Sequence, residues 1–143
     1  MKRDAQAPCM TGQTGMAHAV MNEIAAHLEK LAGRGEAASI DLRSLPMTDM
    51  DREQLEMVLG QGEVSAVIEL AGLTEVRETA FSGVWWVRHM GQDEQVAYEE
   101  IAITRIPEIL KTQLDDIDMA SRRIQQVIES SGRNEFEKEA SNG

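Results

Sequence analysis

The sequence predicts an α+β fold, a two-layer sandwich in which helices pack on one face of a mostly antiparallel sheet. Apolar residues recur at helical spacing near both ends of the 143-residue chain. Between them, several short segments alternate apolar and polar residues, as half-buried strands do. Helices that flank such a run of strands favour a two-layer packing. The length suits one domain, for which we expect residues 15–130, with a flexible leader at 1–14 and a flexible tail at 131–143.

The first helix is predicted by an apolar stripe near the N-terminus. Its members are three or four residues apart and therefore lie on one side of a helix: Met16, Val20, Ile24, Leu28 and Leu31. Gly33 and Gly35 are expected to end this helix. Residues 38–42 then alternate polar and apolar side chains, which predicts a short strand.

A second helix is predicted from Asp49 to Leu59. Thr48 can cap it because its hydroxyl can accept a hydrogen bond from the amide three residues on. Asp49 and Asp51 in the first turn interact favourably with the positive end of the helix dipole. Leu55 belongs to the buried stripe, and Gly60 is suited to the left-handed conformation that often follows a helix.

Four strands are predicted in the centre of the chain. The clearest begins at Gly62 and has apolar residues at every second position: Val64, Ala66, Ile68 and Leu70. The others are expected at 74–81, 83–90 and 95–104. Residues 91–94 have the composition of a hairpin turn, so the strands before and after them should pair antiparallel.

The C-terminal part is predicted to be helical. Pro107 is favoured at the first position of a helix, and apolar residues follow it: Ile109, Leu110 and Leu114. A further helical stretch is expected from Asp116 to Ser130, with an apolar stripe of Ile117, Ala120, Ile124, Val127 and Ile128.

The two tryptophans are adjacent in one predicted strand, so their side chains should point to opposite faces of the sheet. Trp86 shares its face with Arg88, and a guanidinium is costly to bury. We therefore expect Trp85 under the helices and Trp86 on the helix-free face, near Tyr98 and Arg77. Such a set of Trp, Tyr and Arg is typical of interaction hot spots. A dimer mate, a loop or the tails could instead cover Trp86.

Charge and composition exclude several classes of partner. The chain has 25 acidic and 14 basic residues and a formal net charge of −11, which makes nucleic acid and anionic membranes poor partners. The sequence shows neither a membrane-spanning stretch nor a signal peptide, so we expect a cytoplasmic protein. The single cysteine, Cys9, excludes an internal disulfide and is expected to be an exposed thiol.

The sequence offers no metal, cofactor or catalytic motif. His18 and His27 fall on opposite sides of the first helix, and His89 lies on a distant strand. The acidic pairs at 99–100 and 115–116 do not offer two convergent carboxylates. We therefore expect no bound metal, no cofactor and no catalytic residue.

The most specific feature is a set of three segments in a fixed order: LRSLPMTDMDREQLEMVLGQGEVSAVIEL, VRETAFSGVWWVRHM and YEEIAITRIPEIL. Within them, LGQGEVSA is followed by GVWWVRH. This combination resembles the C-terminal conserved region of NiFe-hydrogenase expression/formation proteins of the HupH/HyaF type. The resemblance covers about residues 42–110, including the motif positions Gly62, Glu63, Gly83 and Trp85, for which we expect structural roles.

The resemblance implies an accessory protein, without catalytic activity, that acts while a NiFe hydrogenase is assembled. Its partner would be the iron–sulfur-containing small subunit or another maturation protein, and we expect Trp86, Arg88, Tyr98 and Arg77 to bind it. The longer family members carry a further N-terminal region that resembles a second copy of the unit. A homodimer of this chain would restore that arrangement. The alternative is a small enzyme or ligand-binding protein with a pocket between sheet and helices.

Overall fold

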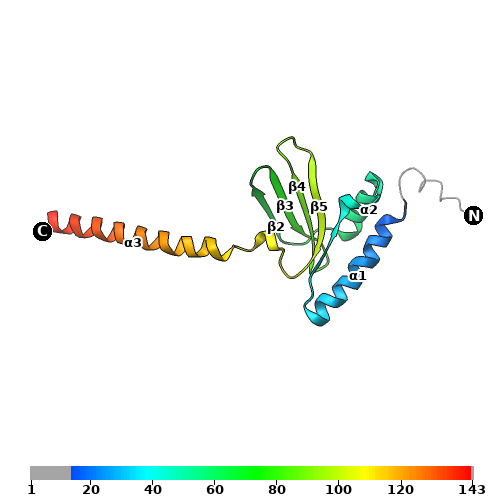
Figure 1. Cartoon of the computed structure of the whole chain (residues 1–143), viewed down its shortest axis with the longest axis horizontal. Helices are drawn as coiled ribbons and strands as arrows, with labels where there is room; N and C mark the ends of the chain where they lie inside the picture. The colour runs from blue at the N-terminus through cyan, green and yellow to red at the C-terminus, as the bar shows by residue number, and fades with distance from the viewer. Residues whose placement is uncertain (1–13, 143) are drawn as a thin grey trace, which may run out of the picture. The chain divides into compact units, whose positions relative to one another are not determined.

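The computed structural model describes residues 14–142 and the side chains of residues 14–133. The predicted leader, with Cys9, lies outside the described residues except for Thr14. The chain divides into two compact units, Met1–Pro107 and Glu108–Gly143, and the single domain expected at 15–130 stays a prediction. Each unit is described by itself, and Figure 1 labels their elements.

Helix α1 (Met16–Arg34) opens the first unit and buries Ala17, Val20 and Ile24. These residues belong to the predicted stripe or lie next to it. The helix ends at Gly35, whose φ of 72° is in the left-handed region that glycine adopts without steric cost. The predicted position of this helix is confirmed.

Helix α2 (Asp49–Leu59) has the predicted bounds. The Thr48 hydroxyl accepts from the Asp51 amide and the Asp51 carboxylate accepts from the Thr48 amide, both at 3.1 Å. This reciprocal pair satisfies two amides that a helix start leaves without a partner. Gly60 follows with a positive φ of 64°, but its ψ of −159° differs from the left-handed helical conformation that we expected.

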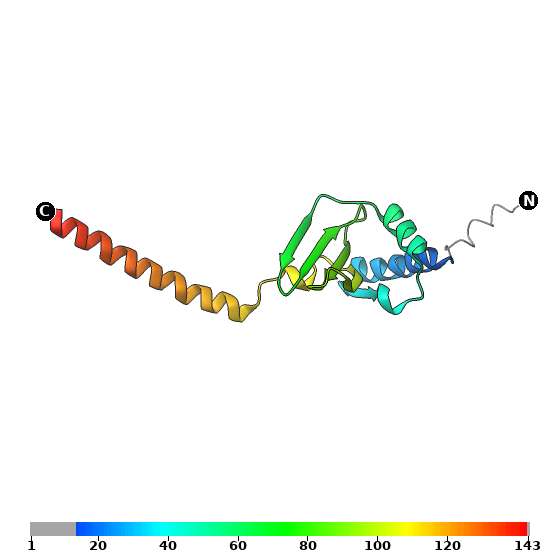
Figure 2. The ribbon, with the colours of Figure 1, turned by 90° about the horizontal axis from the view of Figure 1, so that it is seen from above.

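The sheet contains five strands in the order β1-β5-β4-β3-β2, and every neighbouring pair is antiparallel. The strands are β1 (Ala38–Asp41), β2 (Ser65–Glu69), β3 (Leu73–Glu78), β4 (Val84–Met90) and β5 (Val96–Ile103). A short 3₁₀ helix, η2 (Leu42–Ser44), follows β1. Figure 2 shows the sheet and the two helices from above. The predicted α+β fold is confirmed.

A bulge interrupts the β4–β5 hairpin. His89 pairs with Tyr98, whereas Met90 pairs with Val96, so Ala97 is an additional residue on β5. The bulge shifts the register of the rest of the hairpin by one residue. As a result, Arg88 faces Glu99 and Trp86 faces Ile101.

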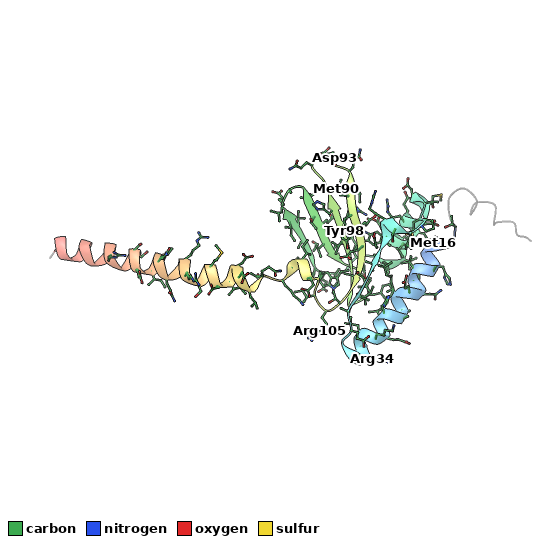
Figure 3. All side chains as sticks on the ribbon, viewed as in Figure 1. Met16, Arg34, Met90, Asp93, Tyr98 and Arg105 are labelled. Atoms are coloured by element: carbon green, nitrogen blue, oxygen red, sulfur yellow. The ribbon has the colours of Figure 1, made fainter. Side chains whose placement is uncertain are left out.

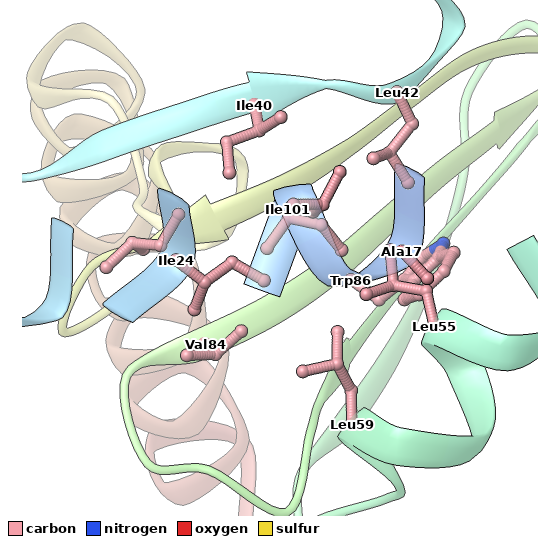
Figure 4. Close-up of a cluster of buried hydrophobic side chains, with 11 residues drawn as sticks. Ala17, Ile24, Ile40, Leu42, Leu55, Leu59, Val84, Trp86 and Ile101 are labelled. Carbon is pink, nitrogen blue, oxygen red and sulfur yellow. The ribbon is translucent and has the colours of Figure 1, made fainter. Parts of the chain in front are cut away.

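The main core lies between the helices and one face of the sheet, which we call the helix face. Figure 4 shows this cluster, in which side chains from α1 and α2 meet those of the sheet. The buried members are Ala17, Val20, Ile24, Ile40, Leu42, Leu55, Leu59, Val84, Trp86, Ile101 and Ile103. The predicted layer of helices over one face of the sheet therefore encloses a continuous apolar core.

The expected orientation of the two tryptophans is wrong. Trp86 belongs to the core under the helices and is 2% exposed, whereas Trp85 points to the opposite face of the sheet, which we call the second face. We had placed Trp86 outside because it shares a face with Arg88. The guanidinium of Arg88 tolerates the helix face because two carboxylates pair with it there.

The second unit begins with a short 3₁₀ helix, η3 (Glu108–Leu110), where we expected an α-helix to start at Pro107. Helix α3 (Leu114–Asn142) follows. It starts two residues before the predicted helix and continues through residues that the sequence predicts to be a tail. No helix within residues 14–142 is long and apolar enough to cross a membrane.

Candidate functional site

Six polar or aromatic side chains gather between α2 and the sheet, and we call them the Trp86 cluster. Two of them, Trp86 and Arg88, lie two positions apart on β4 and therefore share a face. The register then places Arg77 of β3 opposite Trp86 and Glu99 of β5 opposite Arg88. Helix α2 supplies the remaining two members, Arg52 and Glu56, which are one helical turn apart.

Glu99 is the fully buried anion of the cluster, with an exposed fraction of 0%. Its Oε2 accepts hydrogen bonds from Trp86 Nε1 and from Arg88 Nε, both at 2.8 Å. Its Oε1 lies 3.0 Å from Arg52 Nε, an ion-pair distance. The N–H is not directed at that oxygen, and neither atom has a hydrogen-bond partner among the described residues. Two cations therefore compensate the buried charge, one of them without a hydrogen bond.

Glu56 joins the remaining arginines to α2. Its Oε1 accepts from Arg88 Nη2 at 2.6 Å and from Arg77 Nη2 at 3.2 Å. Both guanidiniums also lie over the indole of Trp86, with their central carbons 5.6 Å (Arg77) and 5.9 Å (Arg88) from the ring centroid. These distances are within the range of cation–π attraction. The indole is therefore held by both its N–H and its π face.

The electrostatics of the cluster favour the charged form of Arg88. Burial alone would lower the pKa of Arg88, but hydrogen bonds and the nearby charges of Glu99 and Glu56 outweigh burial and raise it. Three arginines against two glutamates give the cluster a formal charge of +1, within a chain of net charge −11. Asp49 also lies 3.9 Å from Arg52 Nη1, so the charges around the cluster are close to balanced.

The chemistry available to the cluster is that of ion pairing. Both carboxylates are engaged by guanidiniums, so neither is free to act as a general base. Within residues 14–142, no group of three or more His, Cys, Asp or Glu side chains is arranged to hold a metal ion. The contacts instead join α2 to three adjacent strands, which is what a structural cluster requires.

The second face carries Tyr98, the remaining residue that we expected to bind a partner. Tyr98 is 41% exposed, and its hydroxyl donates to Glu100 Oε2 at 2.5 Å. Burial of part of the ring and the Glu100 carboxylate raise the pKa of the Tyr98 hydroxyl. Figure 3 labels Tyr98 on β5. On the neighbouring strands, Thr74 Oγ1 and His89 Nδ1 are 2.7 Å apart.

The sheet therefore separates the four residues that we expected to act together. Trp86, Arg88 and Arg77 lie on the helix face, and Tyr98 lies on the second face. A single flat partner cannot contact all four. The sequence predicts a solvated charge at Glu99, whereas the structure buries it opposite Arg88. Counting from the hairpin turn would not place it there, because the bulge shifts the register by one residue.

Three of the four motif positions, Gly62, Gly83 and Trp85, are constrained by backbone geometry or by hydrogen bonds. At Gly62, the amide donates to the Glu78 carbonyl at 2.8 Å, and a Cβ would lie 2.5 Å from the Thr79 carbonyl oxygen. Gly83 has a φ of 91°, a conformation that favours glycine. Trp85 Nε1 donates to the Thr104 carbonyl at 3.1 Å. Glu63 is exposed.

A second buried carboxylate, Asp51, fastens the segment before α1 to the start of α2. It is 0% exposed and accepts from the Thr14 amide at 2.7 Å and from the Thr14 hydroxyl at 2.6 Å. Burial would raise its pKa, but these bonds and those from Thr48 outweigh burial and lower the pKa to about 2. The sequence predicted the cap at Thr48 but not this link to Thr14.

The fold and the cluster define a small α+β domain in which a buried network of charges joins a helix to an antiparallel sheet. The chain belongs to the HupH hydrogenase expression protein family. The conserved region described as "HupH hydrogenase expression protein, C-terminal conserved region" matches residues 15–131. The family resemblance seen in the sequence is thereby confirmed.

A solved structure and several curated proteins are similar to the chain. The hydrogenase expression protein HupH from Thiobacillus denitrificans is 38% identical, with a TM-score of 0.75 over 83% of this chain and 98% of that one. The hydrogenase expression/formation protein HoxQ of Cupriavidus necator is 32% identical over 74% of this chain. HupH of Rhodobacter capsulatus is 29% identical over 67% of this chain. The chain spans about a third of the length of such curated relatives, 35% of each of these two.

Proposed function

We propose that this protein is an accessory factor in the assembly of a NiFe hydrogenase, acting in the cytoplasm. The observation that carries the proposal is the match of the HupH family region to residues 15–131, most of the chain. The 38% identical structural neighbour, which bears the name hydrogenase expression protein, supports the same role. The curated relatives that match are named hydrogenase expression/formation proteins.

The proposed role is binding rather than catalysis. Apolar side chains fill the space between the sheet and the helices, where the alternative of an enzyme would place its pocket. Among the described residues, the buried carboxylates of that layer are Glu99 of the Trp86 cluster and Asp51. Guanidiniums engage Glu99, and Asp51 accepts hydrogen bonds from Thr14 and Thr48. These features favour a protein that presents a surface over one that holds a small substrate in its interior.

We assign the partner surface to the second face around Tyr98. Tyr98 exposes 41% of its surface and lies beside the carboxylate of Glu100. Tyrosine is enriched in the centres of protein interfaces because it combines a large ring with a hydroxyl. Arg77 and Arg88 are partly exposed on the other face, and Trp86 supports them from the core. The partner is the hydrogenase small subunit or another maturation protein. The part of its surface that contacts Tyr98 must also accommodate the carboxylate of Glu100.

The test is co-purification from a host that makes an uptake NiFe hydrogenase. The tagged chain should recover the small subunit or other maturation proteins, identified by mass spectrometry. The Tyr98→Ala variant should bind that partner about 30-fold more weakly, as expected for a hot spot worth about 2 kcal/mol. Met57, which is 82% exposed on α2, provides the matched control Met57→Ala, with unchanged binding.

Two results would contradict the proposal at different levels. Failure to recover any hydrogenase protein would refute the assembly role. Equal recovery by wild type and Tyr98→Ala would keep the role and refute the assigned surface. Trp86→Ala is unsuitable as an interface probe, because truncation of this core residue should cost about 3–5 kcal/mol of folding stability.

A further inference from the structure

Helix α3 carries a stripe of exposed apolar side chains. Its large members are 49–82% exposed: Leu114, Ile117, Ile124, Val127 and Ile128. At 100° per residue, these residues and Ala120 fall on one side of the helix. Met119, which is also exposed, falls on the opposite side. The stripe is therefore continuous and one-sided.

Such a helix needs a partner to be stable in water. Helical stability in proteins comes mainly from the packing of an amphipathic face. The small residues of the stripe, Ala120 and Ser121, lie between Ile117 on one side and Ile124 on the other. A stripe with small residues at its centre and large ones on both sides is complementary to its own reversed copy.

We propose that α3 pairs with α3 of a second copy of this chain, antiparallel, with Ala120 and Ser121 at the two-fold axis. In this register Ile117 packs against Ile124 of the second copy, and Leu114 packs against its Val127. Each contact occurs twice, as a two-fold interface requires. The small residues at the axis let the two backbones approach closely.

Charge complementarity favours this antiparallel register. Asp116 and Arg123 lie on the same flank of the stripe, seven residues apart. Reversal about Ala120 and Ser121 brings Asp116 level with Gln125 of the second copy, about 3 Å along the axis from its Arg123. Each Asp116 can therefore reach an Arg123 of the other helix. The neighbouring pair Asp118–Arg122, with 3.0 Å between Oδ2 and Nη2, is satisfied within one helix on the outer side. Antiparallel helices also align their dipoles favourably.

The size of the interface determines the protein concentration at which the dimer can be detected. The paired segment, from Leu114 to Val127, is about 20 Å long at 1.5 Å per residue. Two such helices bury on the order of 1,000 Å² in total, at the lower limit for a specific interface. We therefore expect a dimer at tens of micromolar protein that dissociates on dilution.

The first test measures the mass of the full chain by light scattering at 50 to 100 micromolar, roughly where an interface at this lower size limit is occupied. The wild type should be a dimer. Ile124→Glu should be a monomer with the urea stability of the sheet unit unchanged, which separates a lost interface from a lost fold. Met119→Glu places the same charge on the opposite side of the helix and should remain a dimer. A monomeric wild type, or equal behaviour of the two variants, overturns the proposal.

The second test determines the register by disulfide formation in a Cys9→Ser background. Ser121→Cys lies next to the axis and should form an intermolecular disulfide under mild oxidation. Ser131→Cys, on the same stripe, would be about 30 Å from its counterpart in the antiparallel pair and should not. A parallel pair would instead bring both positions next to their counterparts. Cross-linking at Ser131→Cys therefore overturns the proposed register.

Discussion

Replacing Glu99 by Gln tests whether the Trp86 cluster stabilises the fold through its charges. The substitution keeps the shape of the side chain and removes the only fully buried charge of the cluster. The amide oxygen can still accept from Trp86 and Arg88, but the amide nitrogen then faces Arg52 Nε, which was 3.0 Å from a carboxylate oxygen. A buried amide nitrogen then lies beside the guanidinium in place of the charged oxygen, and neither nitrogen has an acceptor there among the described residues.

The magnitude follows from the burial of the partners. Breaking a buried ion pair typically costs about 3–5 kcal/mol. The side chains of Arg52 and Arg88 are 30% and 24% exposed, so water can solvate part of their charge once Glu99 is neutral. We therefore expect the lower end, a loss of about 3 kcal/mol in the free energy of unfolding.

Urea unfolding followed by tryptophan fluorescence and far-UV circular dichroism measures this loss. With slopes of about 1–3 kcal/mol per molar urea, the midpoint should fall by about 1–3 M. Glu63→Gln removes the same charge at an exposed position and should change stability by less than about 0.5 kcal/mol. A loss below about 1 kcal/mol for Glu99→Gln would show that the buried charges add little, and would refute the reasoning.

Three further predictions concern single side chains. Asp51→Ala removes the hydrogen bonds that the carboxylate accepts from Thr14 and Thr48, and it should cost about 1.5–3 kcal/mol at neutral pH. Because the folded pKa of about 2 lies below the ordinary 3.8, the charge-dependent part of this cost is full above about pH 4 and is lost as the pH falls through 2 in acid unfolding curves. Tyr98 is the single tyrosine, so ultraviolet titration reports it alone; its pKa should exceed 10, and Glu100→Gln should move it back toward 10. Gly62→Ala should lower the midpoint of thermal unfolding, because its Cβ would lie 2.5 Å from the Thr79 carbonyl oxygen. Gly33→Ala should raise the midpoint, because Gly33 lies within α1 and its Cβ would meet no atom within 4 Å among the described residues beyond its own helical turn. Equal midpoints for the two variants would contradict this prediction.

The sequence predicted the elements of the first unit well because local signals determine them. The capped start of α2 at Thr48 and its end at Leu59 follow from side chains within one turn of each boundary. Alternation identified β2 to β5, although their ends differ by up to three residues: β2 starts at Ser65 rather than Gly62, and β3 starts one residue earlier but ends at Glu78 rather than Phe81. The ends of β4 and β5 are within one residue of the prediction. Such signals need no knowledge of the rest of the chain.

The tryptophan orientation could not be predicted in the same way, because it depends on a contact between strands. Whether Arg88 can face the core depends on a carboxylate opposite it, and Glu99 occupies that position only because Ala97 bulges. Without the bulge, Arg88 would face Tyr98 instead. The extent of α3 was missed for another reason: the polar residues after Ser130 have no apolar period, yet the helix continues through them.

The contacts of the Trp86 cluster also determine how the first unit opens. Helix α2 cannot leave the sheet without exposing Glu99 and separating it from Arg52, nor without breaking the bonds from Glu56 to Arg77 and Arg88. Helix α1 packs on the same core with apolar residues, and Thr14 ties its start to α2. The backbone amides of α2 should therefore exchange with deuterium together with those of β4 and β5, as one cooperative unit. The C-terminal turns of α1, far along the chain from Thr14, should exchange earlier.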